Sequence, residues 1–245
     1  MTTYRWAELT RERLGALLPQ AWVVLPVGAT EQHGPHLPTG TDALVVDAVV
    51  AAAATTPTGR DLVVAPTLPF GASDHHFPFG GTLSLRVETM TEVLLDLARS
   101  VHAAGGRRLF VVNGHGGNRG PCHSAAQRAA TAHPGLRVAY ADYWELLLAD
   151  AGPDPGGTPV PGHAGAFETS LVAHLRPELV CDLSDRPGPA AAPGPRAVTV
   201  HEQESWTRID GFTDRPATAG ADAGRQWFDA CVAALAARLT ALARS

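Results

Sequence analysis

Histidine and carboxylate side chains gather in four segments of the 245-residue sequence: ATEQHGPHLPTGTD, GASDHHF, NGHGGN and HAGAFETS. The residues of these segments that could do chemistry are Glu31, His33, His36, Asp42, Asp74, His75, His76, His115, His163 and Glu168. Carboxylate oxygens and neutral imidazole nitrogens, with no thiolate among them, suit Zn, Mn or Fe in the divalent state. These residues therefore predict a metal site first of all.

Charge and spacing predict two ions rather than one. Glu31 and His33 are two residues apart, so an extended segment places both side chains on one side of the chain. Glu31, Asp42 and Glu168 bring three negative charges, which two divalent ions and a bridging hydroxide would neutralise. A single divalent ion would leave buried excess anion, which is costly. We therefore expect Glu31, His33, Asp42, His115 and Glu168 to hold two divalent ions.

Each of these signals is weak by itself. Asp42 also fits a simple first-turn helix carboxylate, and Glu168 fits a solvated helix carboxylate. The NGHGGN segment, with Gly116 and Gly117, has a second interpretation as an anion cradle, because backbone N–H groups of a glycine turn before a helix favour phosphate. The combination favours the metal site, and a non-catalytic anion or nucleotide binder stays as an alternative.

Other residues near these segments have two interpretations each. His36, His75 and His76 either orient a ligand through their free ring nitrogen or hydrogen-bond the backbone of their own loops. Trp144 follows an expected strand and either lines the pocket or packs in the core. The sequence leaves these alternatives open.

The polar segments must be positioned by the short apolar runs that precede them, which are typical of buried strands. Strands are expected at 21–27, 62–65, 108–112 and 137–143. Helices are expected at 41–54, at 88–104, from about 118, at 166–175 and at 219–243, with an irregular connection at 186–196. This alternation predicts a layered α/β/α fold with a mostly parallel sheet, in one domain over residues 1–245. The carboxyl ends of the strands would then bring the polar segments to one edge.

Composition narrows the class of protein. Hydrophobic residues make up 45% and charged residues 18% of the chain, which is typical of a folded globular protein. The net charge of −5 argues against a nucleic-acid partner, and the absence of lysine excludes Schiff-base chemistry and a phosphate-loop lysine. Cys122, Cys181 and Cys231 form no C-x-x-C pair and are expected to be buried and reduced. With no signal peptide or membrane span, the chain is expected in the cytoplasm.

Four motifs, in this order and spacing, resemble the creatininase (creatinine amidohydrolase) family: GATEQHGPHLPTGTD, FPFGGTLSL, VVNGHGGN and HAGAFETS. The resemblance runs from about Arg5 to the last helix. It implies a layered α/β fold, a two-metal amidohydrolase site and a homo-oligomer, commonly a hexamer. In that family the residues that match Glu31 and His115 bind one ion, the residue that matches His33 binds the other, and the one that matches Asp42 bridges them.

The sequence also departs from creatininase itself. Gly116 and Gly117 stand where that enzyme has a tyrosine and a metal-binding glutamate, so we expect Glu168 to replace the missing ligand. His163 matches the family's catalytic histidine, and Trp144 matches one of its pocket tryptophans, while a second pocket tryptophan has no counterpart. We expect Trp144, Gly116 and Gly117 to contact the substrate, which the departures suggest is not creatinine.

The function expected from these residues and this resemblance is hydrolysis of a non-peptide or cyclic C–N amide bond in a small molecule. A hydroxide bridging the two ions would attack the carbonyl, and His163 would donate a proton to the departing nitrogen. The glycine-rich turn is shared with other branches of the family, including a formamide hydrolase and the peptidase of mycofactocin maturation. A peptidase that trims a small modified peptide is therefore the enzymatic alternative.

Overall fold

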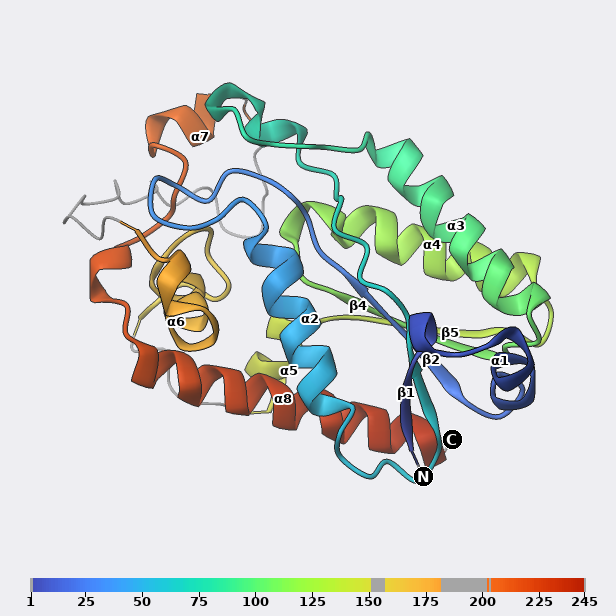
Figure 1. Ribbon diagram of the computed structural model, residues 1–245. Coiled ribbons are helices and arrows are strands. Elements are labelled where there is room, and N and C mark those ends of the chain that lie inside the picture. Colours follow the sequence, from blue (N-terminus) through green and yellow to red (C-terminus); the bar gives the residue numbers. More distant parts are fainter. Residues whose placement is uncertain (1, 151–156, 182–201, 203, 245) are drawn as a thin grey trace.

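A five-stranded parallel sheet forms the centre of the computed structural model, which describes residues 2–150, 157–181, 202 and 204–244 (Figure 1). The strands lie in the order β1-β3-β2-β4-β5. Their bounds are β1 Thr3–Arg5, β2 Trp22–Val27, β3 Leu62–Val64, β4 Arg108–Asn113 and β5 Arg137–Asp142. The four expected strands are confirmed. The sequence does not predict β1, because three residues are too short to show a period.

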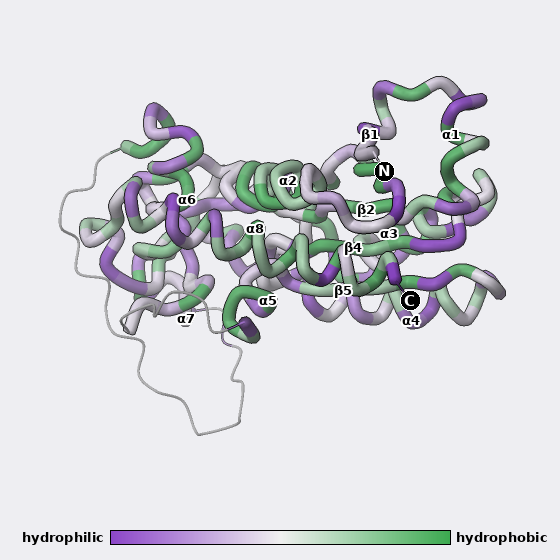
Figure 2. The backbone as a smooth tube through the Cα atoms, turned by 90° about the horizontal axis from the view of Figure 1, so that it is seen from below, coloured by the Kyte–Doolittle hydropathy of each residue, from purple (hydrophilic) through white to green (hydrophobic). Residues whose placement is uncertain are grey.

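Helices cover both faces of the sheet, which confirms the layered α/β/α fold (Figures 1 and 2). Alternate residues of β2 divide between the faces: Trp22 and Val24 join one apolar cluster, and Val23, Leu25 and Val27 join the other. The first cluster packs against α2, α5, α6 and α8, and the second against α3 and α4. Burial on both faces explains why β2 is an unbroken apolar run.

The expected helices are present with small changes at their ends. The helix bounds are α1 Arg11–Leu17, α2 Thr41–Ala53, α3 Val87–Ala103, α4 Arg119–Ala132, α5 Tyr143–Ala149, α6 Ala166–Leu175, α7 Glu204–Arg208 and α8 Ala221–Arg244. The sequence does not predict the short helices α1, α5 and α7. The irregular connection expected at 186–196 lies outside the described residues.

One expectation about the cysteines is wrong. Cys122 and Cys231 are buried in the two apolar clusters, but Cys181 is exposed, because it lies beyond the end of α6 and outside both clusters. Among the described residues, no helix combines the length and the apolar character that crossing a membrane requires.

The start of α2 packs closely against the end of β2, and this contact positions the loop between them. A Cβ atom on Gly28 would lie 2.5 Å from the Cα and 2.6 Å from the backbone nitrogen of Ala43, in the first turn of α2. Backbone atoms cannot move aside as a flexible side chain can, so only glycine allows this approach. Asp42, next to Ala43, is thereby held at the carboxyl edge of the sheet.

We predict that Gly28→Ala destabilises the protein by about 1–3 kcal/mol, because the added methyl group displaces the first turn of α2. Gly15→Ala is the matched control: Gly15 lies in α1, and a Cβ atom added there would have no atom within 4 Å. That change should be neutral or stabilise by up to about 1 kcal/mol. Urea unfolding of the two variants measures the difference, and equal free energies of unfolding would contradict the close packing.

Candidate metal centre and active site

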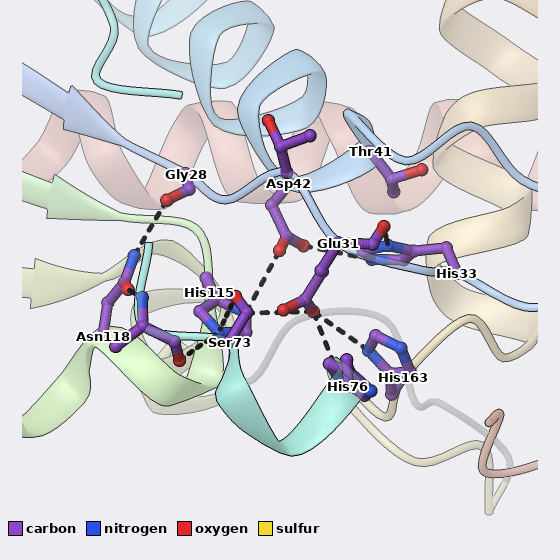
Figure 3. Close-up of polar contacts among 12 residues, drawn as sticks. Gly28, Glu31, His33, Thr41, Asp42, Ser73, His76, His115, Asn118 and His163 are labelled. Atoms are coloured by element: carbon purple, nitrogen blue, oxygen red, sulfur yellow. Dashed lines mark hydrogen bonds and ion pairs between the residues drawn. The ribbon is translucent and has the colours of Figure 1, made fainter. Parts of the chain in front are cut away.

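The predicted ligands meet at the carboxyl edge of the sheet, and Figure 3 shows four of them, Glu31, His33, Asp42 and His115, below the start of α2. Glu31 and His33 come from the loop after β2, Asp42 from the first turn of α2, His115 from the loop after β4, and Glu168 from the first turn of α6. All five side chains are buried. The structure thus brings together side chains from four separate segments of the chain.

Two groups of ligand atoms share Asp42. Its Oδ2 lies 3.1 Å from His115 Nδ1, and that nitrogen is 3.2 Å from Glu31 Oε1. Its Oδ1 lies 3.2 Å from His33 Nε2, which is 3.8 Å from Glu168 Oε2. The two oxygens of Asp42 therefore face different groups, as a bridging carboxylate requires.

Several polar atoms of this cluster lack hydrogen-bond partners among the described residues. These buried atoms are both carboxylate oxygens of Glu31, His33 Nε2, Asp42 Oδ2 and His76 Nε2. A buried polar group without a partner costs about 1–3 kcal/mol, and native proteins contain few of them. Divalent ions would satisfy the carboxylate atoms and the imidazole of His33 together, so the residues present fit a metal centre.

Hydrogen bonds to backbone carbonyls orient the imidazoles of the candidate ligands. His33 Nδ1 lies 3.2 Å from the Glu31 carbonyl oxygen, and His115 Nε2 lies 3.2 Å from the Ala72 carbonyl oxygen. A carbonyl only accepts, so each of these nitrogens is a donor. Once neutral, each ring therefore presents a lone pair from its other nitrogen to the carboxylates, as a metal ligand must.

The side chain of Asn118 fixes the loops that carry these ligands. Its Nδ2 donates to the Gly28 carbonyl at 2.9 Å, and its Oδ1 accepts from the Ala72 backbone N–H at 2.9 Å (Figure 3). Asn118 therefore joins the loops after β2, β3 and β4. This buried amide explains how three separate loops keep one geometry.

The buried carboxylates raise the pKa values of the two histidines between them, His33 and His115, so both histidines stay protonated at neutral pH. Burial opposes a charge on His33, but Asp42 and Glu168 outweigh it and raise the pKa of His33 to about 10. Burial likewise opposes a charge on His115, but Glu31 and Asp42 raise its pKa well above the usual value. Burial, together with the charge of Asp42, raises the pKa of Glu168 to about 8, although His33 opposes this shift.

His163 lies at the side of the cluster and stays neutral. Burial and the neighbouring His33 hold the pKa of His163 well below its usual value. Its Nε2 donates to the Gln32 carbonyl at 3.0 Å, so its Nδ1, 3.5 Å from Glu31 Oε1, carries the lone pair. A neutral imidazole with a lone pair toward the site can accept and return a proton.

The three histidines with two interpretations in the sequence, His36, His75 and His76, lie in different parts of the site. His36 Nε2 lies 2.9 Å from the Ala164 carbonyl, so it holds the loop before α6. His75 and His76 lie in the 3₁₀ helix Asp74–Phe79, and the ring of His76 stacks on that of His163 with centroids 4.2 Å apart.

Trp206 of α7 is a residue that the sequence analysis missed. Its ring lies 4.5 Å from that of His76 and 5.1 Å from that of His163, measured between centroids. The surrounding sequence is polar and has no motif, so only the tertiary structure reveals an aromatic side chain here. Trp144, by contrast, packs in the core beside Tyr143 with ring centroids 5.3 Å apart, and its contact with substrate stays a prediction.

The glycine-rich turn leaves no room for a side chain at Gly117. A Cβ atom there would lie 2.2 Å from the Ala72 carbonyl oxygen and 2.5 Å from His115 Nε2. A carboxylate ligand therefore cannot come from this position in the present geometry. Gly116 is open, with nothing within 4 Å of such an atom. Glu168 faces His33 from α6, with its Oε2 3.8 Å from His33 Nε2.

The fold and the cluster define a layered α/β protein with a candidate metal centre, and the comparisons with known proteins agree. The family model described as creatinine amidohydrolase matches residues 7–239, and the chain belongs to this creatininase family. The "Mycofactocin precursor peptide peptidase" of Mycobacterium ulcerans (strain Agy99) is 36% identical over 234 residues, 89% of this chain and 87% of that protein. The "Creatinine amidohydrolase" of Pseudomonas putida is 30% identical over 240 residues, 87% and 86% of the two chains.

Solved structures of creatininases have the same fold. One described as "Creatininase Mn" is 28% identical with a TM-score of 0.78, and the match covers 96% of this chain and 97% of that one. A creatininase variant described as "Zn-Zn type" is 27% identical with a TM-score of 0.77 and 96% of each chain covered. The protein is therefore a creatininase-family hydrolase that acts on C–N bonds.

We predict that metal binding releases protons. At pH 7 the raised pKa values keep His33, His115 and Glu168 protonated in the metal-free protein, and all three must lose a proton to bind an ion. Proton competition weakens as pH rises, so the apparent metal affinity should increase from pH 6 toward the pKa of His33 at about 10.

Calorimetric titration of Zn²⁺ into metal-free protein, in two buffers of different ionisation enthalpy, measures this release. We expect about three protons per chain at pH 7, one each from His33, His115 and Glu168. The variant His123→Ala, which changes an exposed residue of α4, should give the same number. A titration that releases no protons would contradict the assigned ligands.

Proposed function

We propose that this protein is a metal-dependent peptidase that cleaves an amide bond in a small precursor peptide. The observation that carries this proposal is the identity of 36% to the mycofactocin precursor peptide peptidase, over 89% of this chain, against 30% to the creatinine amidohydrolase. Gly117 supports it, because the glycine-rich turn cannot supply the carboxylate expected there in creatininase itself. The enzymatic alternative from the sequence thus becomes the first candidate.

The proposed cofactors are two divalent ions of Zn, Mn or Fe. Glu31, Asp42 and His115 would hold one ion, and His33, Asp42 and Glu168 the other, because these atoms form the two groups that share Asp42. When bound, such ions polarise the amide carbonyl and lower the pKa of water toward neutrality. The hydroxide bridging both ions stays a prediction from the sequence.

The chain itself supplies the proton transfer. The Nδ1 lone pair of His163 faces the cluster while Nε2–H is held by the Gln32 carbonyl. Nδ1 of His163 would take the proton of the attacking water and deliver it to the departing amide nitrogen. A positioned acid or base of this kind contributes about 10²- to 10⁴-fold in rate. Trp144, Gly116 and Gly117 remain the substrate contacts proposed from the sequence.

Hydrolysis of a non-peptide or cyclic amide is the second candidate. The relative from Pseudomonas putida and the creatininase structures favour it, because their chains match this one almost from end to end. The non-catalytic anion binder is no longer supported, since the chain belongs to a family of hydrolases.

The remaining proposals concern the state of the protein: a single domain over residues 1–245, a cytoplasmic location and a homo-oligomer, commonly a hexamer in this family. Apolar side chains support the oligomer. Phe70, Phe77, Leu83 and Val87 are 40–59% exposed, and all four come from one segment of the chain. Exposed apolar groups of this size gathered in one segment are typical of an interface between copies.

The test of the proposed function is direct. Protein reconstituted with Zn²⁺ or Mn²⁺ is incubated with the mycofactocin precursor peptide, and separately with creatinine, and the products are identified by mass spectrometry. We expect cleavage of the peptide and slower or no hydrolysis of creatinine. Turnover of creatinine with an intact peptide would overturn the peptidase assignment in favour of the second candidate.

We predict that Glu168→Gln lowers the metal content from about two ions per chain to about one, because His33 and Asp42 would lose their third partner. Glu178→Gln is the control, since Glu178 is exposed and its carboxylate pairs with Arg176. Elemental analysis of the two purified variants measures the effect. A metal content in Glu168→Gln equal to that of the control would remove Glu168 from the ligand set.

A further inference from the structure

The side chain of Gln32 has an orientation that its neighbours determine. Its Oε1 accepts from the Gly34 backbone N–H at 2.9 Å, and its Nε2 donates to the Gly211 carbonyl at 2.8 Å. Exchanging the two amide atoms would place N–H against N–H and oxygen against oxygen. The atom that lies 2.9 Å from His76 Nδ1 is therefore the amide nitrogen.

Three atoms lie within hydrogen-bond distance of the Gln32 amide nitrogen, which has two hydrogens to donate. One hydrogen goes to the Gly211 carbonyl, and the other has His76 Nδ1 at 2.9 Å and His163 Nε2 at 3.0 Å. His163 Nε2 also lies 3.0 Å from the backbone carbonyl of Gln32, which can only accept. That nitrogen is therefore a donor, and the second amide hydrogen is left for His76.

This contact fixes the tautomer of His76. The amide nitrogen of Gln32 only donates, so His76 Nδ1 must be the acceptor. In a neutral imidazole the proton is then on Nε2. His76 is thus the reverse of His33 and His115, whose outer nitrogens donate to carbonyls and whose inner nitrogens carry lone pairs once the rings are neutral.

The same tautomer excludes His76 from the ligand set. Its Nε2 lies 3.4 Å from Glu31 Oε1, and with Glu31 and His163 it forms a group compact enough to hold an ion. A metal ligand needs a lone pair on that nitrogen, which would force the proton onto Nδ1 and against the N–H of Gln32. His76 therefore presents an N–H, not a lone pair, to the cluster.

That N–H is buried and forms no hydrogen bond among the described residues, although Glu31 Oε1 lies 3.4 Å from its nitrogen. It lies beside the proton-transfer residue, since the rings of His76 and His163 stack at 4.2 Å, and the ring of Trp206 closes against both. A buried donor of this kind stabilises negative charge strongly, because it is already oriented and is shielded from water.

We propose that His76 is a catalytic residue whose Nε2–H donates a hydrogen bond to the carbonyl oxygen of the scissile amide, and that Gln32 is the positioning residue that holds this tautomer. Negative charge grows on that oxygen as the nucleophile adds, so the hydrogen bond is strongest in the transition state. No covalent bond to His76 forms, and its proton stays on Nε2. This inference rests on the proposed amide hydrolysis but not on whether the substrate is a peptide.

The first test needs no activity. In metal-free protein labelled with ¹⁵N-histidine, the chemical shifts and two-bond couplings of each ring distinguish a protonated nitrogen from one with a lone pair. His76, assigned by comparison with His76→Gln, should show a protonated Nε2 and an unprotonated Nδ1. A lone pair on Nε2 would overturn the proposal. In Gln32→Met, which lacks the amide donor, the two tautomers of His76 should mix.

The second test compares two replacements of His76 on whichever amide the wild-type enzyme cleaves. His76→Phe keeps a ring to stack on His163 and Trp206 but has no donor, whereas His76→Gln retains an N–H near the position of Nε2. We expect kcat to fall about 10²- to 10³-fold in His76→Phe and within about tenfold in His76→Gln. The metal content and the unfolding temperature of both should stay near the wild-type values.

Two results would overturn the catalytic role. One is a wild-type kcat in His76→Phe; the other is loss of metal from that variant, which would show that His76 supports Glu31 instead. A wild-type enzyme that cleaves neither the precursor peptide nor creatinine would contradict the proposed function, and the tautomer measured by NMR would still decide whether His76 presents a donor.

Discussion

Buried negative charge is the constraint on which the rest of this structure depends. Glu31, Asp42 and Glu168 lie together at the carboxyl edge of the sheet, each almost completely shielded from water. Carboxylates in such a place need cations, because the cost of burying unpaired charge is several kcal/mol for each ion. In the metal-free protein, protonated His33 and His115 supply part of that charge, and the raised pKa of Glu168 removes some of the rest. Divalent ions would replace those protons, so metal binding should be coupled to proton release.

The surrounding fold holds this charge in place through backbone contacts rather than through long side chains. Gly28 lets α2 approach the end of β2, which sets the position of Asp42. Asn118 joins three loops, and backbone carbonyls orient His33, His115 and His163. These hydrogen bonds are buried, so they leave little freedom to the candidate ligand atoms. Supporting hydrogen bonds of this kind keep ligand side chains in the orientation that metal binding requires.

Much of the fold, and the meeting of the candidate ligands at one edge of the sheet, could be predicted from the sequence, because both depend on local patterns. Valine-rich runs mark strands that are buried on both faces, and the polar segments after them reach one edge of the sheet whatever the details of the loops. Three features could not be predicted. The strand β1 is too short to be periodic, Trp206 lies in a polar stretch without a motif, and the tautomer of His76 depends on which atom of Gln32 faces it. Each is set by tertiary contacts between distant parts of the chain.

The central claim is that Asp42 bridges two ions, and a crystal of the Zn²⁺-loaded protein tests it most directly. Diffraction data collected above and below the zinc absorption edge locate the ions independently of the protein atoms. The account predicts two anomalous peaks, one beside Asp42 Oδ2 with Glu31 and His115, and one beside Asp42 Oδ1 with His33 and Glu168. A single peak, or a pair of peaks of which only one touches Asp42, would contradict it.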